Sequence, residues 1–326
     1  MKAIVYTKYG SPDVLQLKEV EKTIPKDSEA LVKIHAASAN PIDWHLIRGK
    51  PFFARFSSGF LKPKNPIPGI DIAGRVEVVG NSVTQFQPGD EVFGCVTGAF
   101  AEYVAACEND LALKPTNLLF EQAAAIPVVA FTALQGLRDY GHIQAGQKVL
   151  INGASGGVGT FAVQIAKSFG TEVTGVCSTR NLDLVRSIGA DHVVDYTRED
   201  FTRTGQRYDL IFCTVGNRSA SAYKRALSPN GKCVMTGFTT MSHLLIRVLF
   251  LGSLLSMTGS KKIEMMGVAK PNQKDLLFVI ELLEAGKVVP VIDRCYLLSE
   301  TAEAIRYLEK GHARGKVIIT VEQNNN

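Results

Sequence analysis

Two patterns of apolar positions divide the chain into a strand-rich first part and a mixed second part. The first third is rich in β-branched residues, in runs such as VKIHAASA and RVEVVG, and in turn signals. These features are typical of a strand-dominated domain. Between residues 147 and 238, apolar runs instead alternate with amphipathic stretches whose apolar residues recur every three or four positions. This second pattern predicts strands and helices in turn.

The mixed part predicts one parallel sheet with helices on both of its faces. Its expected strands are KVLING, EVTGVCS, HVVDY, YDLIFCTV and GKCVMTGF, and its expected helices are VGTFAVQIAKSF, NLDLVRSIG and NRSASAYKRAL. Short turns between alternating strands and helices are typical of a doubly wound sheet, which binds its ligand at the carboxyl ends of its strands. A helix near 272–285, the strand VIDRCYLL, the helix SETAEAIRYLEKG and the strand GKVIITV follow, and the tail EQNNN is expected to be disordered.

A glycine-rich turn joins the first of these strands to the helix that begins near Val158. Its small residues are Gly153, Ser155, Gly156, Gly157 and Gly159. Side chains at the glycine positions would block the tight turn or the approach of a pyrophosphate to the free N–H groups of the helix. Because strand, turn, helix and second strand follow in the required order, we expect a dinucleotide to bind here; the alternative is a glycine-rich turn without a ligand.

The end of the second strand indicates which dinucleotide is bound. A free ribose 2′-hydroxyl would require an Asp or Glu about 20 residues after the glycines, but the chain has Cys177, Ser178, Thr179 and Arg180 there. Hydroxyls and a guanidinium fit a 2′-phosphate, and each charge-assisted hydrogen bond contributes about 1.5–3 kcal/mol. We therefore expect NADPH as the cofactor. The alternative for Arg180 is a solvated residue at the start of the next helix.

Composition and charge exclude several classes of protein. The 326 residues, 46% of them hydrophobic and 21% charged, are typical of two folded domains. The net charge of +5 comes without a block of like charges, so no nucleic-acid partner is expected. The six cysteines are far apart and form no Cys-x-x-Cys pair, as expected of reduced thiols in an intracellular protein.

Two further stretches bear on the location of the protein. The chain starts directly with the strand-like KAIVYT and shows no secretion signal, which favours the cytoplasm. The apolar run LLIRVLFLGSLL at 244–255 is 12 residues long, whereas a transmembrane helix needs about 20. We expect no transmembrane segment and interpret this run as a buried helix at a domain or subunit interface, with peripheral membrane contact as the alternative.

An ordered series of motifs extends over nearly the whole chain: MKAIVYTKYGSPDVLQL, ANPIDWHLIRG, PGIDIAGRVEVVG, PGDEVFG, AAAIPVVAFTAL, GASGGVGTFAVQIAK, GADHVVDY and GHARGKVII. The series resembles the zinc-independent, quinone-oxidoreductase-like branch of the medium-chain dehydrogenase/reductase superfamily. The resemblance implies an α/β protein in which a Rossmann doubly wound parallel sheet, residues 125–267, is inserted in a GroES-like, partly open β-barrel catalytic domain, residues 1–124 and 268–326. It also implies a homodimer, formed through the edge strand KKIEMMGV.

The same resemblance implies roles for individual cofactor-binding residues. Ser178, Arg180 and Tyr196 would hold the adenosine 2′-phosphate and ribose, although Tyr196 could also be a half-buried aromatic at a strand end. The rest of the cofactor would lie along Thr132, Val158, Val215 and Phe238.

The resemblance also bears on metal binding and hence on the chemistry. Zinc-dependent relatives hold a catalytic metal with a Cys, a His-Glu pair and a further Cys; the matching positions here are Asn40, Ile70 and Asp71, and Val128 or Val129. Catalytic zinc needs three protein ligands, so we expect no metal. Without a Lewis acid an isolated alkoxide is hard to form. The predicted reaction is therefore NADPH-dependent hydride transfer to a small apolar conjugated substrate, a quinone or an α,β-unsaturated carbonyl (enone or alkenal).

Asn40 and Asp43 are the candidate catalytic residues. They lie three residues apart in NPIDWHLIRG, on one turn if this stretch is helical as the family implies. Asn40 is expected to orient the nicotinamide or a substrate oxygen, and Asp43 to fix that arrangement; alternatively, Asp43 only caps the helix. The nearby Trp44, Phe52 and Phe53 could line a flat substrate pocket or be core residues.

Other functions stay open at this point. One is a detoxifying alkenal or enone reductase that hardly uses quinones, and another is a zinc alcohol dehydrogenase. A different class is an NADPH-binding, redox-sensing or membrane-associated partner protein with little turnover. The apolar run at 244–255 and the lack of a convincing general acid favour this last alternative.

Overall fold

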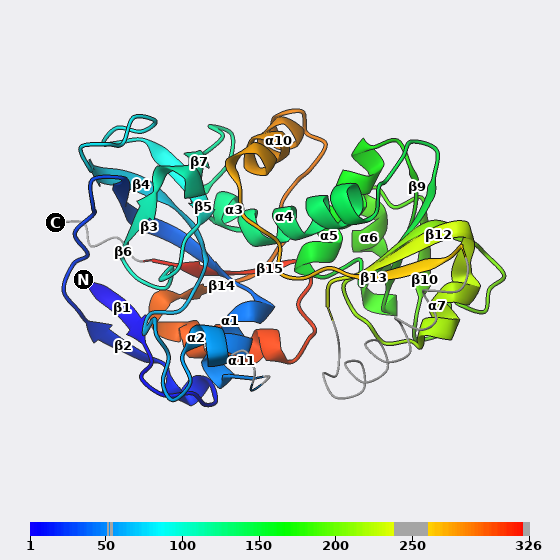
Figure 1. Ribbon diagram of the computed structural model, residues 1–326, viewed down its shortest axis with the longest axis horizontal. Helices are drawn as coiled ribbons and strands as arrows, with labels where there is room; N and C mark the ends of the chain where they lie inside the picture. The colour runs from blue at the N-terminus through cyan, green and yellow to red at the C-terminus, as the bar shows by residue number, and fades with distance from the viewer. Residues whose placement is uncertain (51, 53–54, 238–259, 322–326) are drawn as a thin grey trace. The chain divides into compact units, whose positions relative to one another are not determined.

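The computed structural model describes residues 1–50, 52, 55–237 and 260–321 (Figure 1). The chain forms two compact units. Unit 1 comprises Met1–Val128, Pro271–Glu284 and Pro290–Asn326, and unit 2 comprises Val129–Lys270 and Ala285–Val289. Our expected boundaries lay after residues 124 and 267, without the short return of the chain to unit 2 at 285–289. The expectations for Phe53, for Phe238, for the run at 244–255 and for the tail at 322–326 lie outside the described residues.

Unit 1 is built on a seven-stranded sheet of order β14-β15-β3-β4-β5-β7, in which β6 also pairs with β3. The strands of this sheet are β3 (Glu29–Ala39), β4 (Asp71–Val79), β5 (Glu91–Cys95), β6 (Tyr103–Cys107), β7 (Leu111–Leu113), β14 (Ile292–Leu297) and β15 (Lys316–Thr320). A separate hairpin pairs β1 (Lys2–Val5) with β2 (Gln16–Glu19). The long strand β3 is buried on both faces over most of its length, which explains why its run VKIHAASA is so poor in charge.

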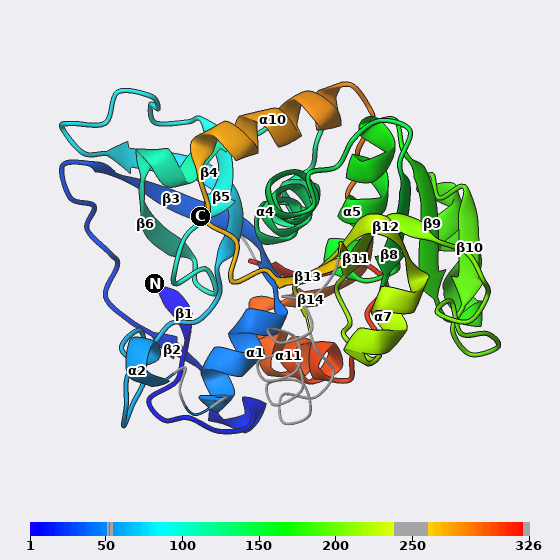
Figure 2. The ribbon, with the colours of Figure 1, turned by 45° about the vertical axis from the view of Figure 1, so that its right-hand side comes forward.

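Unit 1 also contains helices. They are α1 (Pro41–Arg48), α2 (Arg55–Ser58), α3 (Phe120–Ala124), α10 (Gln273–Glu284) and α11 (Thr301–Glu309). In both ribbon views α1 lies beside α11 (Figures 1 and 2). Helix α1 begins at a proline directly after Asn40 and ends at Gly49, which adopts the left-handed φ of 58°. Both features are common helix boundaries.

Unit 2 contains a six-stranded, fully parallel sheet of order β10-β9-β8-β11-β12-β13. The strands are β8 (Lys148–Asn152), β9 (Glu172–Cys177), β10 (His192–Asp195), β11 (Tyr208–Cys213), β12 (Leu227–Met235) and β13 (Lys262–Met265). Figure 2 shows the first five strands of this sheet side by side. Strand order reverses between β8 and β11, the switch point at which doubly wound sheets bind nucleotides. The predicted Rossmann sheet is confirmed.

The helices of unit 2 follow the predicted alternation. They are α5 (Gly157–Ser168), α6 (Leu182–Ser187) and α7 (Ala220–Ala226), with α4 (Pro127–Gln135) leading in from unit 1. Helix α5 buries eight consecutive residues, Gly159–Ala166, and only Thr160 and Gln164 among them are polar. No helix among the described residues is both long and apolar enough to cross a membrane.

Candidate active site

The glycine turn of unit 2 has the geometry that its sequence predicts. Gly153 adopts a φ of 91°, and a Cβ there would lie 2.3 Å from Thr214 Oγ1. A Cβ on Gly159 would lie 2.0 Å from the carbonyl oxygen of Gly153. Both positions therefore require glycine for the turn itself. Gly156 meets only the Gly153 carbonyl oxygen, 3.6 Å from an added Cβ, so the space beside it is open.

The first turn of α5 offers backbone donors to a bound anion. The helix begins after Gly156 and runs through Gly157, Val158 and Gly159, with no acidic side chain in its first turn. The N–H groups of this turn have no acceptor within the helix, and the helix dipole adds partial positive charge. A pyrophosphate fits these donors.

A buried amide connects this turn to the end of β9. Asn181 Nδ2 donates to Ser155 Oγ at 2.9 Å and to Ser178 Oγ at 3.2 Å. Asn181 is 5% exposed, and its Oδ1 atom has no hydrogen-bond partner in the described part of the chain. The sequence analysis did not predict a role for Asn181. The only signal in the sequence was an asparagine shortly after an apolar strand. Its partners Ser155 and Ser178 lie 26 and 3 residues away, so no local pattern indicated these contacts.

One of the side chains expected to bind a 2′-phosphate is already hydrogen-bonded within the protein. Thr179 donates its hydroxyl to the carboxylate of Asp195, so this hydroxyl is used inside the protein. Ser178 is half-buried and Arg180 exposed, directly after β9. Tyr196 follows β10, which pairs in parallel with β9 so that Asp195 lies opposite Cys177. The structure thus brings Ser178, Arg180 and Tyr196 to the same edge of the sheet.

The remaining predicted cofactor residues have the following positions. Val215 follows β11, and its carbonyl oxygen accepts a 2.7 Å hydrogen bond from Asn152 Nδ2 at the end of β8. Val158 is half-buried in the first turn of α5, and Thr132 is buried in α4. Whether these residues contact a cofactor stays a prediction.

The core of unit 1 contains a buried polar network centred on Asp71, the first residue of β4. Asp71 lies opposite Ser38 of β3 and opposite Cys95 of β5, and its side chain is completely buried. Its Oδ2 accepts from Ser38 Oγ at 2.8 Å, from Asn40 Nδ2 at 2.9 Å and from Lys316 Nζ at 3.2 Å. Its Oδ1 accepts from the Val128 amide at 3.0 Å and from Cys95 Sγ at 3.5 Å.

Lys316 is one residue of this network that the sequence analysis missed. It begins β15, whose next residue, Val317, lies opposite Ala39 of β3, and it is 2% exposed. Lys316 Nζ also donates to Asn40 Oδ1 at 2.7 Å. A single lysine at the start of an apolar strand normally reaches solvent, and Asp71 is 245 residues away. The sequence therefore gave only a weak signal for this ion pair.

The amide of Asn40 is largely used by this network. Its Nδ2 group donates to Asp71 and, at 3.3 Å, to the carbonyl oxygen of Ser38. Its Oδ1 accepts from Lys316 and keeps one further lone pair. The role of Asn40 toward a cofactor or a substrate stays a prediction: its side chain is completely buried, and its remaining hydrogen-bonding capacity is that of an acceptor.

Asp43 caps helix α1 and is itself buried. Its Oδ2 accepts from the Asn40 amide at 2.7 Å, whereas Oδ1 has no partner within the described residues. Burial raises the pKa of Asp43 to about 7, and the charge of Asp71 adds to the rise, while the Asn40 amide and the charge of Lys316 oppose it. The capping function that we considered as an alternative is thus present, and a further role in catalysis is untested.

The two described aromatics expected near a substrate differ in burial. Trp44 is half-buried and stacks on His45 with ring centroids 3.6 Å apart. Phe52 is 57% exposed and meets the edge of Phe60 at a centroid distance of 5.6 Å. Neither position tests the expected role in a substrate pocket.

Metal donors are few in the described residues. No group of three or more His, Cys, Asp or Glu side chains in this part of the chain could hold a metal ion. Asp71 and Cys95 do meet, but burial and the charge of Asp71 raise the pKa of the Cys95 thiol well above its usual range. In the structure this thiol donates to Asp71 Oδ1 at 3.5 Å. Zinc independence itself stays a prediction.

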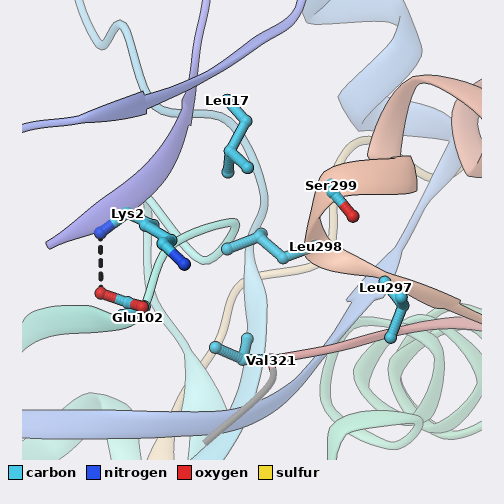
Figure 3. Close-up of a pocket in the computed structure, with 7 residues that line it drawn as sticks. All are labelled: Lys2, Leu17, Glu102, Leu297, Leu298, Ser299 and Val321. Atoms are coloured by element: carbon cyan, nitrogen blue, oxygen red, sulfur yellow. Dashed lines mark hydrogen bonds between the residues drawn. The ribbon is translucent and has the colours of Figure 1, made fainter. Parts of the chain in front are cut away.

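A small pocket in unit 1 lies apart from these residues (Figure 3). Its volume is about 50 Å³, enough for a few water molecules. Its lining residues are Lys2, Leu17, Glu102, Leu297, Leu298, Ser299 and Val321. Because no predicted site residue lines it, we do not interpret it as the substrate site.

Comparisons with known proteins agree with this architecture. Residues 26–116 match the alcohol dehydrogenase GroES-like domain, and residues 188–319 match the zinc-binding dehydrogenase family. A quinone-oxidoreductase homolog of *Spinacia oleracea* chloroplasts is 36% identical, with 98% of each chain covered. An NADPH-dependent alkenal/one oxidoreductase of *Arabidopsis thaliana* chloroplasts is 36% identical over 98% of this chain and 79% of the relative.

The fold also agrees with that of a solved structure. The quinone oxidoreductase from *Coxiella burnetii* superimposes with a TM-score of 0.85 at 30% identity, covering 99% of each chain. The motif series, the Rossmann sheet and these full-length relatives together show that the chain belongs to the medium-chain dehydrogenase/reductase superfamily.

Proposed function

We propose that this protein is an NADPH-dependent reductase that transfers hydride to a quinone or to an α,β-unsaturated carbonyl compound. One observation carries the choice of cofactor: beyond the glycine turn, the end of β9 offers Ser178 and Arg180, and the nearby carboxylate of Asp195 is occupied by Thr179 and Thr197. The relatives named as a quinone-oxidoreductase homolog and an NADPH-dependent alkenal/one oxidoreductase support the reaction.

Unit 2 supplies the cofactor-binding residues. The turn from Gly153 to Gly159 would hold the pyrophosphate, and Ser178, Arg180 and Tyr196 the 2′-phosphate and its ribose. Thr132, Val158, Val215 and Phe238 would lie along the remainder. The nicotinamide supplies the hydride when NADPH is bound.

Unit 1 supplies a fixed acceptor. Because both N–H groups of Asn40 already donate to Asp71 and Ser38, the remaining lone pair on the buried Asn40 Oδ1 suits a donor, such as a carboxamide N–H of nicotinamide. It does not suit the oxygen of a substrate carbonyl. We therefore favour Asn40 as the residue that orients the nicotinamide, with Lys316 and Asp71 fixing its amide and Asp43 fixing its backbone.

The substrate class follows from the charge that must be stabilised. The buried charges of Lys316 and Asp71 already compensate each other at 3.2 Å, so this ammonium is not free to stabilise an alkoxide. Conjugated acceptors require less electrostatic stabilisation, since their negative charge spreads over an enolate or a phenolate. Such a reaction needs no Lewis acid, so zinc independence is part of the proposal.

A substrate panel tests the function. NADPH and NADH oxidation would be followed by absorbance with a quinone, an enone, an alkenal and a saturated ketone. We expect turnover with conjugated acceptors and NADPH, and none with the saturated ketone. Tight NADPH binding without turnover on any acceptor would instead support a redox-sensing partner protein.

Two further parts of the proposal concern assembly and location. We propose a homodimer through β13, the last strand of the parallel sheet within the described residues, which sedimentation analysis would test. We also propose a reducing compartment, the cytoplasm, supported by the six free cysteines. Fractionation of the source cells tests this location, and recovery of the protein in an organelle would contradict it. The names of two relatives place those proteins in chloroplasts.

A further inference from the structure

Asn181 occupies a position that neither helix capping nor folding stability explains. It directly precedes α6 but makes no side-chain capping hydrogen bond to that helix. Its amide instead reaches Ser155 and Ser178, while the buried Oδ1 has no partner among the described residues. An orphaned buried oxygen lowers stability, so another requirement must favour this amide.

The direction of the two hydrogen bonds indicates that requirement. A serine hydroxyl has one hydrogen and two lone pairs. Where Asn181 Nδ2 donates into a lone pair of each hydroxyl, the O–H hydrogen of that serine must point to some other acceptor. Phosphate oxygens only accept hydrogen bonds, so a serine hydroxyl whose hydrogen points away from Asn181 can donate to a phosphate.

We propose that Asn181 is a positioning residue that makes donors of two serine hydroxyls, each toward a different phosphate of the bound dinucleotide. Ser155 lies in the turn that holds the pyrophosphate, and Ser178 lies at the end of β9, where the 2′-phosphate is expected. One side chain thereby coordinates recognition of both ends of the adenosine half. The inference rests on the proposed function, because it requires a phosphorylated dinucleotide in unit 2.

An aspartate at this position would have the opposite effect. A carboxylate accepts hydrogen bonds, so the two serine hydroxyls would donate to it and would no longer be available to phosphate. It would also add a negative charge. Leucine has the branched shape of asparagine but a larger volume, and it neither donates nor accepts hydrogen bonds, so it removes the orientation of the hydroxyls.

The test measures dissociation constants for NADPH and NADH, without turnover, from the change in nicotinamide fluorescence. We expect Asn181→Leu to weaken NADPH binding about tenfold and Asn181→Asp more than about a hundredfold. NADH binding should weaken less, because NADH lacks the phosphate that faces Ser178. Thermal unfolding of each variant checks that it is folded at the temperature of the titration.

The same substitution in a Ser155→Ala/Ser178→Ala background separates positioning from packing. Without the hydroxyls, we expect Asn181→Leu to change NADPH affinity less than about twofold. The same tenfold loss in both backgrounds would overturn the inference but leave the proposed function standing. Failure of the wild-type protein to bind either dinucleotide would overturn the proposed function, and this inference with it. If Asn181→Leu does not fold, Asn181→Ala tests the same coupling.

Discussion

Replacing Lys316 with methionine would remove the buried ammonium of the Asp71 network and keep most of the length of the side chain. The change removes two hydrogen bonds, to Asn40 Oδ1 at 2.7 Å and to Asp71 Oδ2 at 3.2 Å. Asp71, completely buried, would retain only neutral donors. Breaking a buried ion pair by removing one partner costs about 3–5 kcal/mol, a large part of the roughly 5–15 kcal/mol by which a domain is stable.

Urea unfolding followed by circular dichroism measures this loss. We expect Lys316→Met to lower the free energy of unfolding by about 3–5 kcal/mol, and Lys310→Met, at an exposed lysine, to change it by less than about 0.5 kcal/mol. Adding Asp71→Asn removes the unpaired charge, so the double variant should be more stable than Lys316→Met alone. A loss below about 1 kcal/mol, or no recovery in the double variant, would refute the interpretation of the network as a paired buried charge.

Three further predictions concern single residues. Arg180→Asp should weaken NADPH binding far more than NADH binding; equal losses in fluorescence titrations would show that the 2′-phosphate is held elsewhere. Gly159→Ala should abolish dinucleotide binding, because its Cβ would lie 2.0 Å from the Gly153 carbonyl oxygen, whereas Gly267→Ala, with nothing within 4 Å, should bind normally. The pKa of Asp43 is raised to about 7, so its stabilising contribution is complete below pH 3.8 and is lost as the pH rises through 7. Asp43→Asn should therefore flatten the fall in unfolding free energy over this range, and parallel stability profiles for both proteins would contradict the assignment.

Local patterns were sufficient to predict most of unit 2. Its strands and helices are short-range features, so the alternation of apolar runs and amphipathic stretches located β8 to β12 and α5 to α7 along the chain. The turn at Gly153 and Gly159 was equally readable, because its steric requirement lies within a few residues. The resemblance to a known family then supplied the split barrel, whose strand pairing joins the two ends of the sequence.

Long-range pairing limited what the sequence could show of the site. Lys316 reaches Asp71 only because β15 pairs with β3 and β3 with β4, a register that no local pattern contains. The same limit hid the link from Ser155 to Ser178 through Asn181. Thr179 was counted among the hydroxyls available to a 2′-phosphate, but its partner Asp195 lies on the neighbouring strand. In each case the local sequence did not show which side chains meet in the folded chain.

The position to which hydride is delivered tests the central claim most directly. NADPH deuterated at the reactive C4 position would be incubated with the protein and an enone, and the product analysed by nuclear magnetic resonance. The account predicts a saturated ketone with deuterium on the β-carbon, because delocalisation into an enolate makes that carbon the acceptor. Deuterium on the carbonyl carbon, in an allylic alcohol, would contradict it.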